Sequence, residues 1–199
     1  MQSPSLRVIR KSSFTATPWK NGGGITHEAI RVPESGDPFR WRVSVAHIDA
    51  SGPFSDFAAY DRKMVLLQGA GIDLRFAGGE RRTLRTAGDL VEFDGATSTY
   101  CELLNGPCVD LNLMIAKPDR AAVRVERFIE SLALRASRGE SLLVFPIDRK
   151  VTLSINAGET VTLDPWDLAV LSQCSGRLDR IGPANSSVST AVFLATLAS

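Results

Sequence analysis

The chain has 199 residues, a length that fits one large domain or two small ones. Hydrophobic residues make up 44% of it and charged residues 23%, which is close to the globular average and excludes a chain disordered along its whole length. The formal net charge is +1, from 23 basic and 22 acidic residues, and this balance argues against a nucleic-acid-binding protein with a broad basic field.

The N-terminal segment, the apolar runs and the cysteines bear on the cellular compartment. Residues 1–13 contain basic residues but no apolar run after them, so we do not expect a secretory signal. No stretch approaches the length of about 18 apolar residues that a membrane span needs. Cys101, Cys108 and Cys174 are odd in number and have no close CxxC spacing, so we expect buried thiols in a cytoplasmic protein.

Short apolar or alternating runs recur along the chain, separated by turn signals of Gly, Pro, Asn and Asp. Many short strands at a spacing of about 8–12 residues are typical of an all-β sandwich or barrel. The expected strands are 41–48, 64–67, 72–76, 90–93, 111–115, 141–145, 151–155, 168–171 and 188–194.

Residues 119–138 fit two kinds of structure. Apolar residues from Ala122 to Leu132 recur at helical spacing, but residues 123–128 also alternate between apolar and polar as a strand does. Periodicity alone does not decide between them. We expect a strand at the start of this segment and an irregular or short helical stretch after it.

An internal repeat joins the two halves of the chain. The pattern Gly-Glu-x-x-Thr-Leu followed by Asp-Leu begins at Gly79 and again at Gly158, with its aspartates at Asp89 and Asp167. Each copy predicts a hairpin turn, a strand, a tight turn at the aspartate and another strand. A duplicated β-barrel unit explains the pattern, and a chance match between short segments is the alternative.

The first copy of the repeat, from residue 65 through Gly88-Asp89-Leu90, resembles the central strands of cupins, which are small antiparallel jelly-roll barrels. Metal-binding cupins place two His and a Glu before the first of these strands and a third His after the Gly-Asp turn. The corresponding stretches of this chain contain no His, and the whole chain has only His27 and His47. A site of two His and one carboxylate would require these two to converge, and we expect neither a metal nor another cofactor.

A second resemblance is more specific. Residues 18–28, Pro-Trp-Lys-Asn-Gly-Gly-Gly-Ile-Thr-His-Glu, are similar to the opening signature of the HutD/Ves family, and further motifs follow in the same order up to residue 116. Those motifs lie at 39–46, 52–55, 61–62, 88–90, 93–95, 106–107 and 110–114.

This resemblance implies both a fold and a role. HutD/Ves proteins are bacterial bicupins, so it implies an all-β fold of two tandem cupin-like jelly-roll barrels, residues 1–118 with the family motifs and residues 119–199 without them. HutD members accompany histidine-utilisation genes. The resemblance therefore implies an accessory or regulatory protein of histidine breakdown that binds a small molecule.

The glycine-rich motif has two interpretations. Asn21-Gly22 is a strong signal for a type I′ turn, which predicts a simple hairpin between the first two strands. Three successive glycines exceed what that turn needs, and they also let a backbone approach a ligand and expose N–H donors. We therefore include Lys20, Asn21, Gly22 and Gly23 among the candidate ligand contacts.

Alternation along residues 40–47 separates two faces. Trp41 and His47 fall on an apolar face, where His47 is expected to be a core histidine, while Arg42 and Ser44 fall on the other. The sequence does not say which face points into a barrel. If Arg42 and Ser44 do, they suit a carboxylate, because a guanidinium binds it bidentately and a hydroxyl adds one bond.

Three more polar residues complete the candidate site. Glu28 follows the glycines on a strand, Arg62 precedes the strand 64–67, and Asn112 lies on the polar face of 110–114. Each also has a purely structural interpretation, as an ion-pair or turn residue or as a solvated polar side chain. In the functional interpretation Arg62 is a second anchor for an anion, and the Asn112 amide offers two donors and an acceptor.

Three functions remain open at this point. The first is a non-enzymatic binder of a small anionic metabolite, such as urocanate or formylglutamate, in a metal-free barrel. The second is a metal-independent enzyme on such metabolites with Glu28 or His47 as the base, although no nucleophile motif is present and we expect no catalytic residue. The third is a dimeric protein-interaction module. We expect no nucleic-acid or membrane partner.

Overall fold

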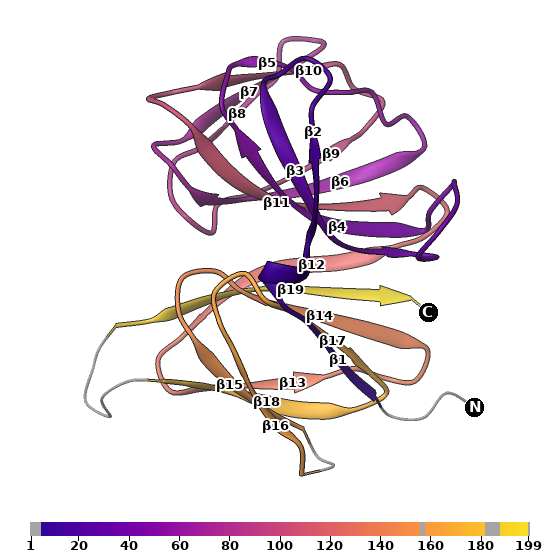
Figure 1. The fold of residues 1–199 in the computed structure, drawn as a ribbon, viewed down its shortest axis with the longest axis vertical. Coiled ribbons are helices and arrows are strands. Elements are labelled where there is room, and N and C mark those ends of the chain that lie inside the picture. The colour runs from indigo at the N-terminus through magenta and orange to yellow at the C-terminus, as the bar shows by residue number, and fades with distance from the viewer. Residues whose placement is uncertain (1–4, 156–157, 182–187, 199) are drawn as a thin grey trace. The chain divides into compact units, whose positions relative to one another are not determined.

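The protein is almost entirely β-structure (Figure 1). A computed structural model describes residues 5–155, 158–181 and 188–198. Within these ranges the chain forms strands β1 to β19 and one 3₁₀ turn, η1 (Lys11–Ser13), but no α-helix. The same ranges contain no helix with the length and apolar character that a bilayer crossing demands. The expected all-β class is confirmed.

The chain divides into two compact units, which we call the first and second barrels. The first barrel is Ser13–Arg120, and the second combines residues 5–12 with residues 121–198. The division expected after residue 118 therefore falls two residues later, and the N-terminal strand β1 (Ser5–Ile9) is placed differently. It pairs antiparallel with β17 (Leu168–Ser172), with Ser5 opposite Ser172, so it completes a sheet of the second barrel (Figure 1).

The first barrel is a sandwich of a six-stranded and a four-stranded sheet. The larger sheet has the order β2 (Thr15–Pro18), β3 (Gly24–Val32), β4 (Trp41–Ile48), β11 (Cys108–Ala116), β6 (Tyr60–Gln68) and β9 (Leu90–Asp94). The smaller has the order β5 (Gly52–Pro53), β10 (Thr99–Leu103), β7 (Ile72–Phe76) and β8 (Arg81–Leu84). Apolar side chains from both sheets, such as Met64 and Leu74, form one core cluster. This core fills only part of the interior.

The second barrel repeats the architecture with nine strands. Its larger sheet has the order β1, β17, β14 (Glu140–Pro146), β19 (Thr190–Ala198) and β12 (Ala121–Phe128). Its smaller sheet has the order β13 (Ser131–Arg135), β18 (Ser175–Arg180), β15 (Val151–Ile155) and β16 (Thr160–Leu163). The core cluster between them is built from aliphatic side chains such as Val144 and Leu153, together with Phe128.

The nine strands expected from the sequence all coincide with or overlap observed strands, although the last begins at Thr190 and not at Val188. The strand expected at the start of 119–138 is confirmed as β12, but the irregular or short helical stretch expected after it is wrong, because β13 forms there and pairs with β18. Residues 121–128 form β12, which pairs with β19 along its whole length, and the next residues turn into β13. The ladder with β19 satisfies the backbone of this segment, so tertiary pairing decides what the periodicity left open.

The two aspartates of the internal repeat perform the same task. Asp89 accepts hydrogen bonds from the backbone N–H groups of Arg85 and Thr86, at 2.7 and 2.9 Å, before β9. Asp167 accepts one from the N–H of Asp164, at 3.0 Å, before β17. The repeat therefore marks equivalent turns in the two barrels, as a duplicated unit predicts.

The glycine-rich loop between β2 and β3 is wider than the expected two-residue turn. Trp19 N–H donates to the Gly24 carbonyl at 2.9 Å and Gly22 N–H to the Trp19 carbonyl at 3.0 Å. Gly22 has φ of 71°, whereas Asn21 is not among the non-glycine residues of the described chain with positive φ. The type I′ turn at Asn21-Gly22 is therefore wrong, because that turn needs positive φ at both positions.

The other two glycines have separate roles. The Asn21 side-chain oxygen accepts a hydrogen bond from Gly23 N–H at 3.0 Å, and the Gly23 carbonyl accepts from Asp49 N–H at 2.9 Å. At Gly24, a Cβ atom would overlap the His47 carbonyl oxygen and lie 3.2 Å from the Trp19 ring. Gly24 thus permits the close approach that fixes the loop against β4.

We predict that Gly24→Ala lowers the free energy of unfolding by about 1–3 kcal/mol, because the methyl group must displace backbone and ring atoms. Urea unfolding measures the change. Gly52→Ala is the matched control, since nothing lies within 4 Å of a Cβ at that position. Equal unfolding free energies for the two variants would contradict the assigned role of Gly24.

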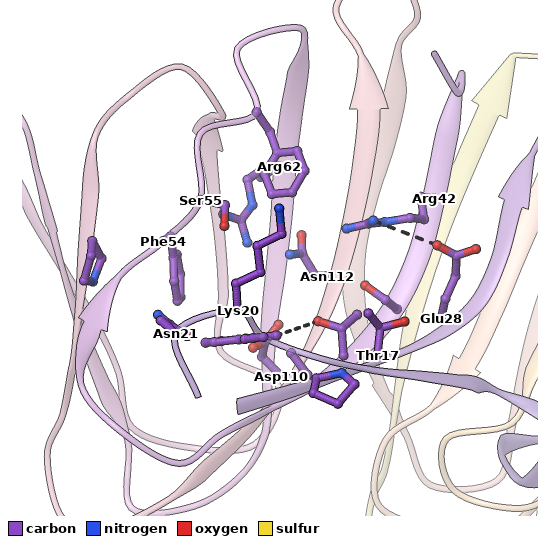
Figure 2. A pocket seen from close by; sticks show the side chains of 17 residues that line it. Thr17, Lys20, Asn21, Glu28, Arg42, Phe54, Ser55, Arg62, Asp110 and Asn112 are labelled. Atoms are coloured by element: carbon purple, nitrogen blue, oxygen red, sulfur yellow. Dashed lines mark hydrogen bonds and ion pairs between the residues drawn. The ribbon is translucent and has the colours of Figure 1, made fainter. Parts of the chain in front are cut away.

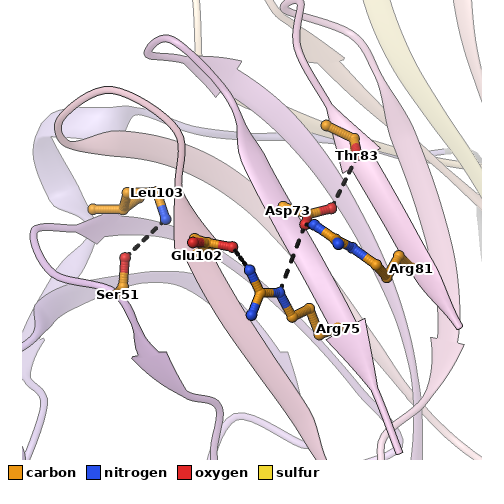
Figure 3. Close-up of polar contacts among 7 residues, drawn as sticks. All are labelled: Ser51, Asp73, Arg75, Arg81, Thr83, Glu102 and Leu103. Carbon is orange, nitrogen blue, oxygen red and sulfur yellow. Dashed lines mark hydrogen bonds and ion pairs between the residues drawn. The ribbon is translucent and has the colours of Figure 1, made fainter. Parts of the chain in front are cut away.

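A buried carboxylate organises one face of the smaller sheet (Figure 3). Asp73 on β7 is 2% exposed and accepts hydrogen bonds from Arg81 Nε at 3.0 Å and Thr83 Oγ1 at 2.9 Å, both on β8. Arg75 lies 3.8 Å from the same carboxylate and also pairs with Glu102 on β10. Although burial alone would raise the pKa of Asp73, the hydrogen bonds from Arg81 and Thr83 and the nearby positive charges lower it.

A depressed pKa stabilises the fold above the carboxyl's unfolded pKa of about 3.9, and this stabilisation is lost as the pH falls through the folded value. We therefore expect Asp73→Asn to cost about 1 kcal/mol at pH 7, where the exposed Arg81 partner limits the loss, and progressively less below pH 4. Urea unfolding of both proteins at pH 7 and at a pH below 4 tests this expectation. Asp49→Asn, at an exposed position of the same barrel, should cost nothing at either pH.

Candidate functional site

A polar floor lies on the inward face of the six-stranded sheet of the first barrel. Antiparallel pairing sets Glu28 of β3 opposite Ser44 of β4, and Ser44 opposite Asn112 of β11. One step along the strands, Thr26, Ala46 and Asp110 form a second row. Directly opposed residues of an antiparallel ladder project from the same face, so these side chains share one surface. The face of β4 that carries Arg42 and Ser44 is therefore the inward one.

Two loops close this floor into a cavity of about 520 Å³ (Figure 2). The β2–β3 loop contributes Trp19, Lys20 and Asn21, and Figure 2 shows Lys20 extending from it into the cavity. The segment after β5 contributes Phe54, Ser55 and Phe57. Its backbone is anchored by hydrogen bonds from Phe54 N–H to the Thr99 carbonyl, 2.9 Å, and from Phe57 N–H to the Gly95 carbonyl, 3.0 Å. This volume suits a small metabolite.

Arg62 of β6 is the most unusual residue of the cavity. It is 6% exposed, and its guanidinium carbon lies 4.9, 5.8 and 5.0 Å from the ring centroids of Phe54, Phe57 and Phe93. No hydrogen bond or ion pair joins it to another residue of the described chain, and its Nε is buried without a partner. Burial lowers the pKa of Arg62 to about 10, against the opposing effect of the Asp110 charge. The group remains a cation at neutral pH.

A second guanidinium lies in the same row of the sheet. Arg42 of β4 is opposite Met114 of β11, and Met114 is opposite Arg62 of β6, so the two arginines are separated by one strand. Arg42 Nη1 is 3.9 Å from the Glu28 carboxylate, and Nη2 donates to Met114 Sδ at 3.1 Å. Burial lowers the pKa of Arg42, although the Glu28 charge partly offsets this. Its Nε, like that of Arg62, is buried without a partner in the described chain.

Two acceptor oxygens complete the polar lining. Asp110 is 2% exposed and Asn112 is 7% exposed, and in the described chain Oδ1 of each has no hydrogen-bond partner. Burial raises the pKa of Asp110 to about 7, and the Arg62 charge limits the rise. Four of the six buried, unpartnered side-chain atoms of the described residues thus belong to Arg42, Arg62, Asp110 and Asn112. Buried polar groups are normally satisfied, so their concentration here indicates a ligand site.

Seven of the nine candidate contacts meet in this cavity, and their role in binding stays a prediction. They are Lys20, Asn21, Glu28, Arg42, Ser44, Arg62 and Asn112. Gly22 and Gly23 do not line it, because Gly22 forms the turn and Gly23 holds Asn21 and the β4–β5 segment through its backbone.

The sequence reasoning omitted Asp110 and the aromatic wall. Asp110 shares a face with Asn112 two residues later, so the same alternation that pointed to Asn112 could have included it. Phe54 and Phe57 lie on an irregular segment, where no periodicity predicts which side chains turn inward.

The two histidines converge, but outside the cavity. His27 and His47 do not line it, and they alternate along β3 and β4 with residues that do. Their ring centroids are 5.2 Å apart, with an angle of 65° between the ring planes. Among the residues that the structure describes, no group of three or more His, Cys, Asp or Glu is placed to hold a metal ion.

Comparisons with known proteins agree with the motifs. The HutD family model matches residues 11–187. A Pseudomonas putida protein described as an uncharacterized 21.2 kDa protein in the hutC 3′ region is 37% identical over 163 residues, which are 81% of this chain and 84% of the relative.

Solved structures give the same result. A conserved protein of unknown function from Pseudomonas aeruginosa PAO1 superposes with a TM-score of 0.86 at 32% identity, over 98% of this chain and all of that chain. HutD from Pseudomonas fluorescens SBW25 gives 0.79 at 27% identity over the same shares. An oxalate decarboxylase, at 0.64 and 10% identity, shares the cupin fold alone. From its family model, its relatives and its two cupin-like barrels, the chain belongs to the HutD/Ves family.

Proposed function

We propose that this protein is an accessory or regulatory factor of histidine utilisation that binds a small carboxylate in the cavity of the first barrel. The observation that carries the proposal is Arg62, a buried cation without a hydrogen-bonded partner in the described chain. An isolated charge taken out of water costs several kcal/mol unless it is paired. A carboxylate bound at Arg62 offsets that cost, because the guanidinium matches it with two parallel hydrogen bonds.

The second guanidinium favours a ligand with two anionic groups. Strands are about 4.8 Å apart, so the Cα atoms of Arg42 and Arg62, separated by one strand, are about 10 Å apart with both side chains directed inward. Formylglutamate, a five-carbon dicarboxylate with a formamide, places carboxylates near both, while Asn112 and Ser44 meet its amide. Among the metabolites of histidine breakdown it fits this cavity better than urocanate, which has one carboxylate.

One of the compared structures bears on the chemical class of the ligand. The HutD structure from Pseudomonas fluorescens SBW25 is described as a formate condition, and formate is the simplest carboxylate. The enzymatic alternative retains only Glu28 as a base, because His47 does not line the cavity.

Arg62→Gln should weaken formylglutamate binding at least about 30-fold, since removing one member of a buried charge pair costs about 2 kcal/mol or more. In a thermal-shift screen, a ligand at about 100 times its dissociation constant stabilises the wild-type fold by about 2.7 kcal/mol. The panel is formylglutamate, urocanate, glutamate, glutarate and formate. Arg82→Gln, at an exposed arginine paired with Glu80, is the matched control and should bind like the wild type.

The substitution Arg42→Gln distinguishes the contribution of Arg42 to ligand binding from that of Arg62. We expect it to weaken formylglutamate and glutarate about fivefold while leaving formate affinity nearly unchanged, because formate occupies one guanidinium only. If no compound of the panel raises the melting temperature of the wild-type protein, the proposed function is overturned. Turnover of formylglutamate that is lost in Glu28→Gln, with binding intact, would establish the enzymatic alternative instead.

A further inference from the structure

Resting on the proposed function, we infer that Asp110 is a specificity-determining residue: its carboxyl group is protonated when the anion is bound and donates that proton in a hydrogen bond to the bound carboxylate. Ligand binding above neutral pH then takes up one proton from solvent.

The position of Asp110 is unfavourable for a charged carboxylate. Its side chain is 2% exposed, it has no ion pair within the described chain, and Oδ1 has no hydrogen-bond partner there. The ladder between β11 and β4 is regular from Cys108 to Ile115, so Asp110 projects from the same face as Asn112 two residues later. The carboxyl group consequently lines the cavity among the groups that would receive an anion.

The surroundings of Asp110 contain one strong counter-charge and little else. Arg62 of β6 is the charged group that acts on Asp110, the Cys101 thiol of β10 also interacts with it, and Ala46 of β4 is opposite it in the sheet, while Lys20 and Thr26 line the same cavity. Burial raises the pKa of Cys101 to about 12, so its thiol stays neutral. Burial likewise raises the pKa of Asp110 to about 7, even against the charge of Arg62, so the acid form is accessible at neutral pH.

The chemistry of the ligand then decides the protonation state. A second carboxylate beside an ionised Asp110 would repel it, whereas a protonated Asp110 supplies an O–H···O⁻ hydrogen bond, one of the strongest available to a carboxylate. The anion therefore raises the proton affinity of Asp110 further. The step balances as a proton transfer: a buffer acid in solvent gives up one proton, an O–H bond forms on an Asp110 oxygen, and that O–H donates one hydrogen bond to the ligand.

Calorimetric titration of the wild-type protein with formylglutamate tests the coupling. At about pH 8.5, titrations in phosphate and Tris buffers, whose ionisation enthalpies differ, should reveal uptake of about one proton, and at about pH 5.5 uptake near zero. Between pH 7.5 and 8.5 the dissociation constant should rise about tenfold. Both carboxyl groups of formylglutamate stay ionised over this range, so they do not contribute.

Asp110→Asn keeps a donor and an acceptor but cannot titrate. The variant should bind formylglutamate with nearly the same affinity at pH 7.5 and pH 8.5, and without proton uptake. Asp73→Asn is the matched control, because it makes the same change at another carboxyl group with 2% exposure in the same barrel and outside the cavity. It should retain the proton uptake of the wild type.

A second measurement needs no ligand and is independent of whether the proposed function holds. A carboxyl whose folded pKa is raised stabilises the fold fully below its unfolded pKa of about 3.9, and this contribution is lost as the pH rises through about 7. The unfolding free energy of wild type relative to Asp110→Asn should therefore fall between pH 4 and pH 8. A difference that does not change with pH would overturn the protonated state.

The outcomes separate the two proposals. Binding of formylglutamate without proton uptake at about pH 8.5 overturns the role of Asp110 and leaves the proposed function standing. Absence of binding by any carboxylate of the panel overturns the proposed function and the coupling with it. Loss of proton uptake in Asp73→Asn as well as in Asp110→Asn would also overturn the assignment to Asp110.

Discussion

The interior of the first barrel is organised around one guanidinium that the protein buries without giving it a hydrogen-bonded anion. Arg62 lies among three phenylalanine rings, which stabilise its charge through their π-faces. The nearest carboxyl, Asp110, is itself buried, and the two groups influence each other's charge without forming an ion pair within 4 Å. Most of the cavity follows from accommodating this cation: an aromatic wall on a tethered loop, a polar floor, and a further arginine in the same row.

The two barrels show what duplication of a fold permits. Both have a small sheet packed on a larger one, and both place an aspartate at the same turn of the repeat. The interior of the second barrel is filled by aliphatic side chains together with Phe128, so its inward-facing residues pack against one another. In the first, the apolar cluster around Met64 and Leu74 fills only one part of the interior, and the remainder is polar. One copy of the fold is thus filled by its own apolar core, whereas the other keeps a cavity lined by polar side chains.

The sequence predicted the all-β architecture and most of the cavity because both depend on local alternation. Once Arg42 was known to face inward, the ladder register placed Ser44, Glu28 and Asn112 beside it. Three things lay beyond that reasoning. The β2–β3 loop depends on a close approach of Gly24 to β4, the aromatic wall depends on an irregular segment, and β13 became a strand through its pairing with β18. Each is a contact between residues distant in sequence, and no local pattern encodes it.

The pairing of β1 with β17 has a consequence for the order of folding. All strands of the first barrel lie in one uninterrupted stretch, so that barrel can form as soon as its own residues have been synthesised. The larger sheet of the second barrel, in contrast, pairs Ser5 with Ser172, one on each side of the first barrel in sequence. Its edge strand β1 is therefore made before the first barrel, and its partner β17 after it. The first barrel can fold while β1 is still unpaired, and closing this edge joins segments far apart in the chain.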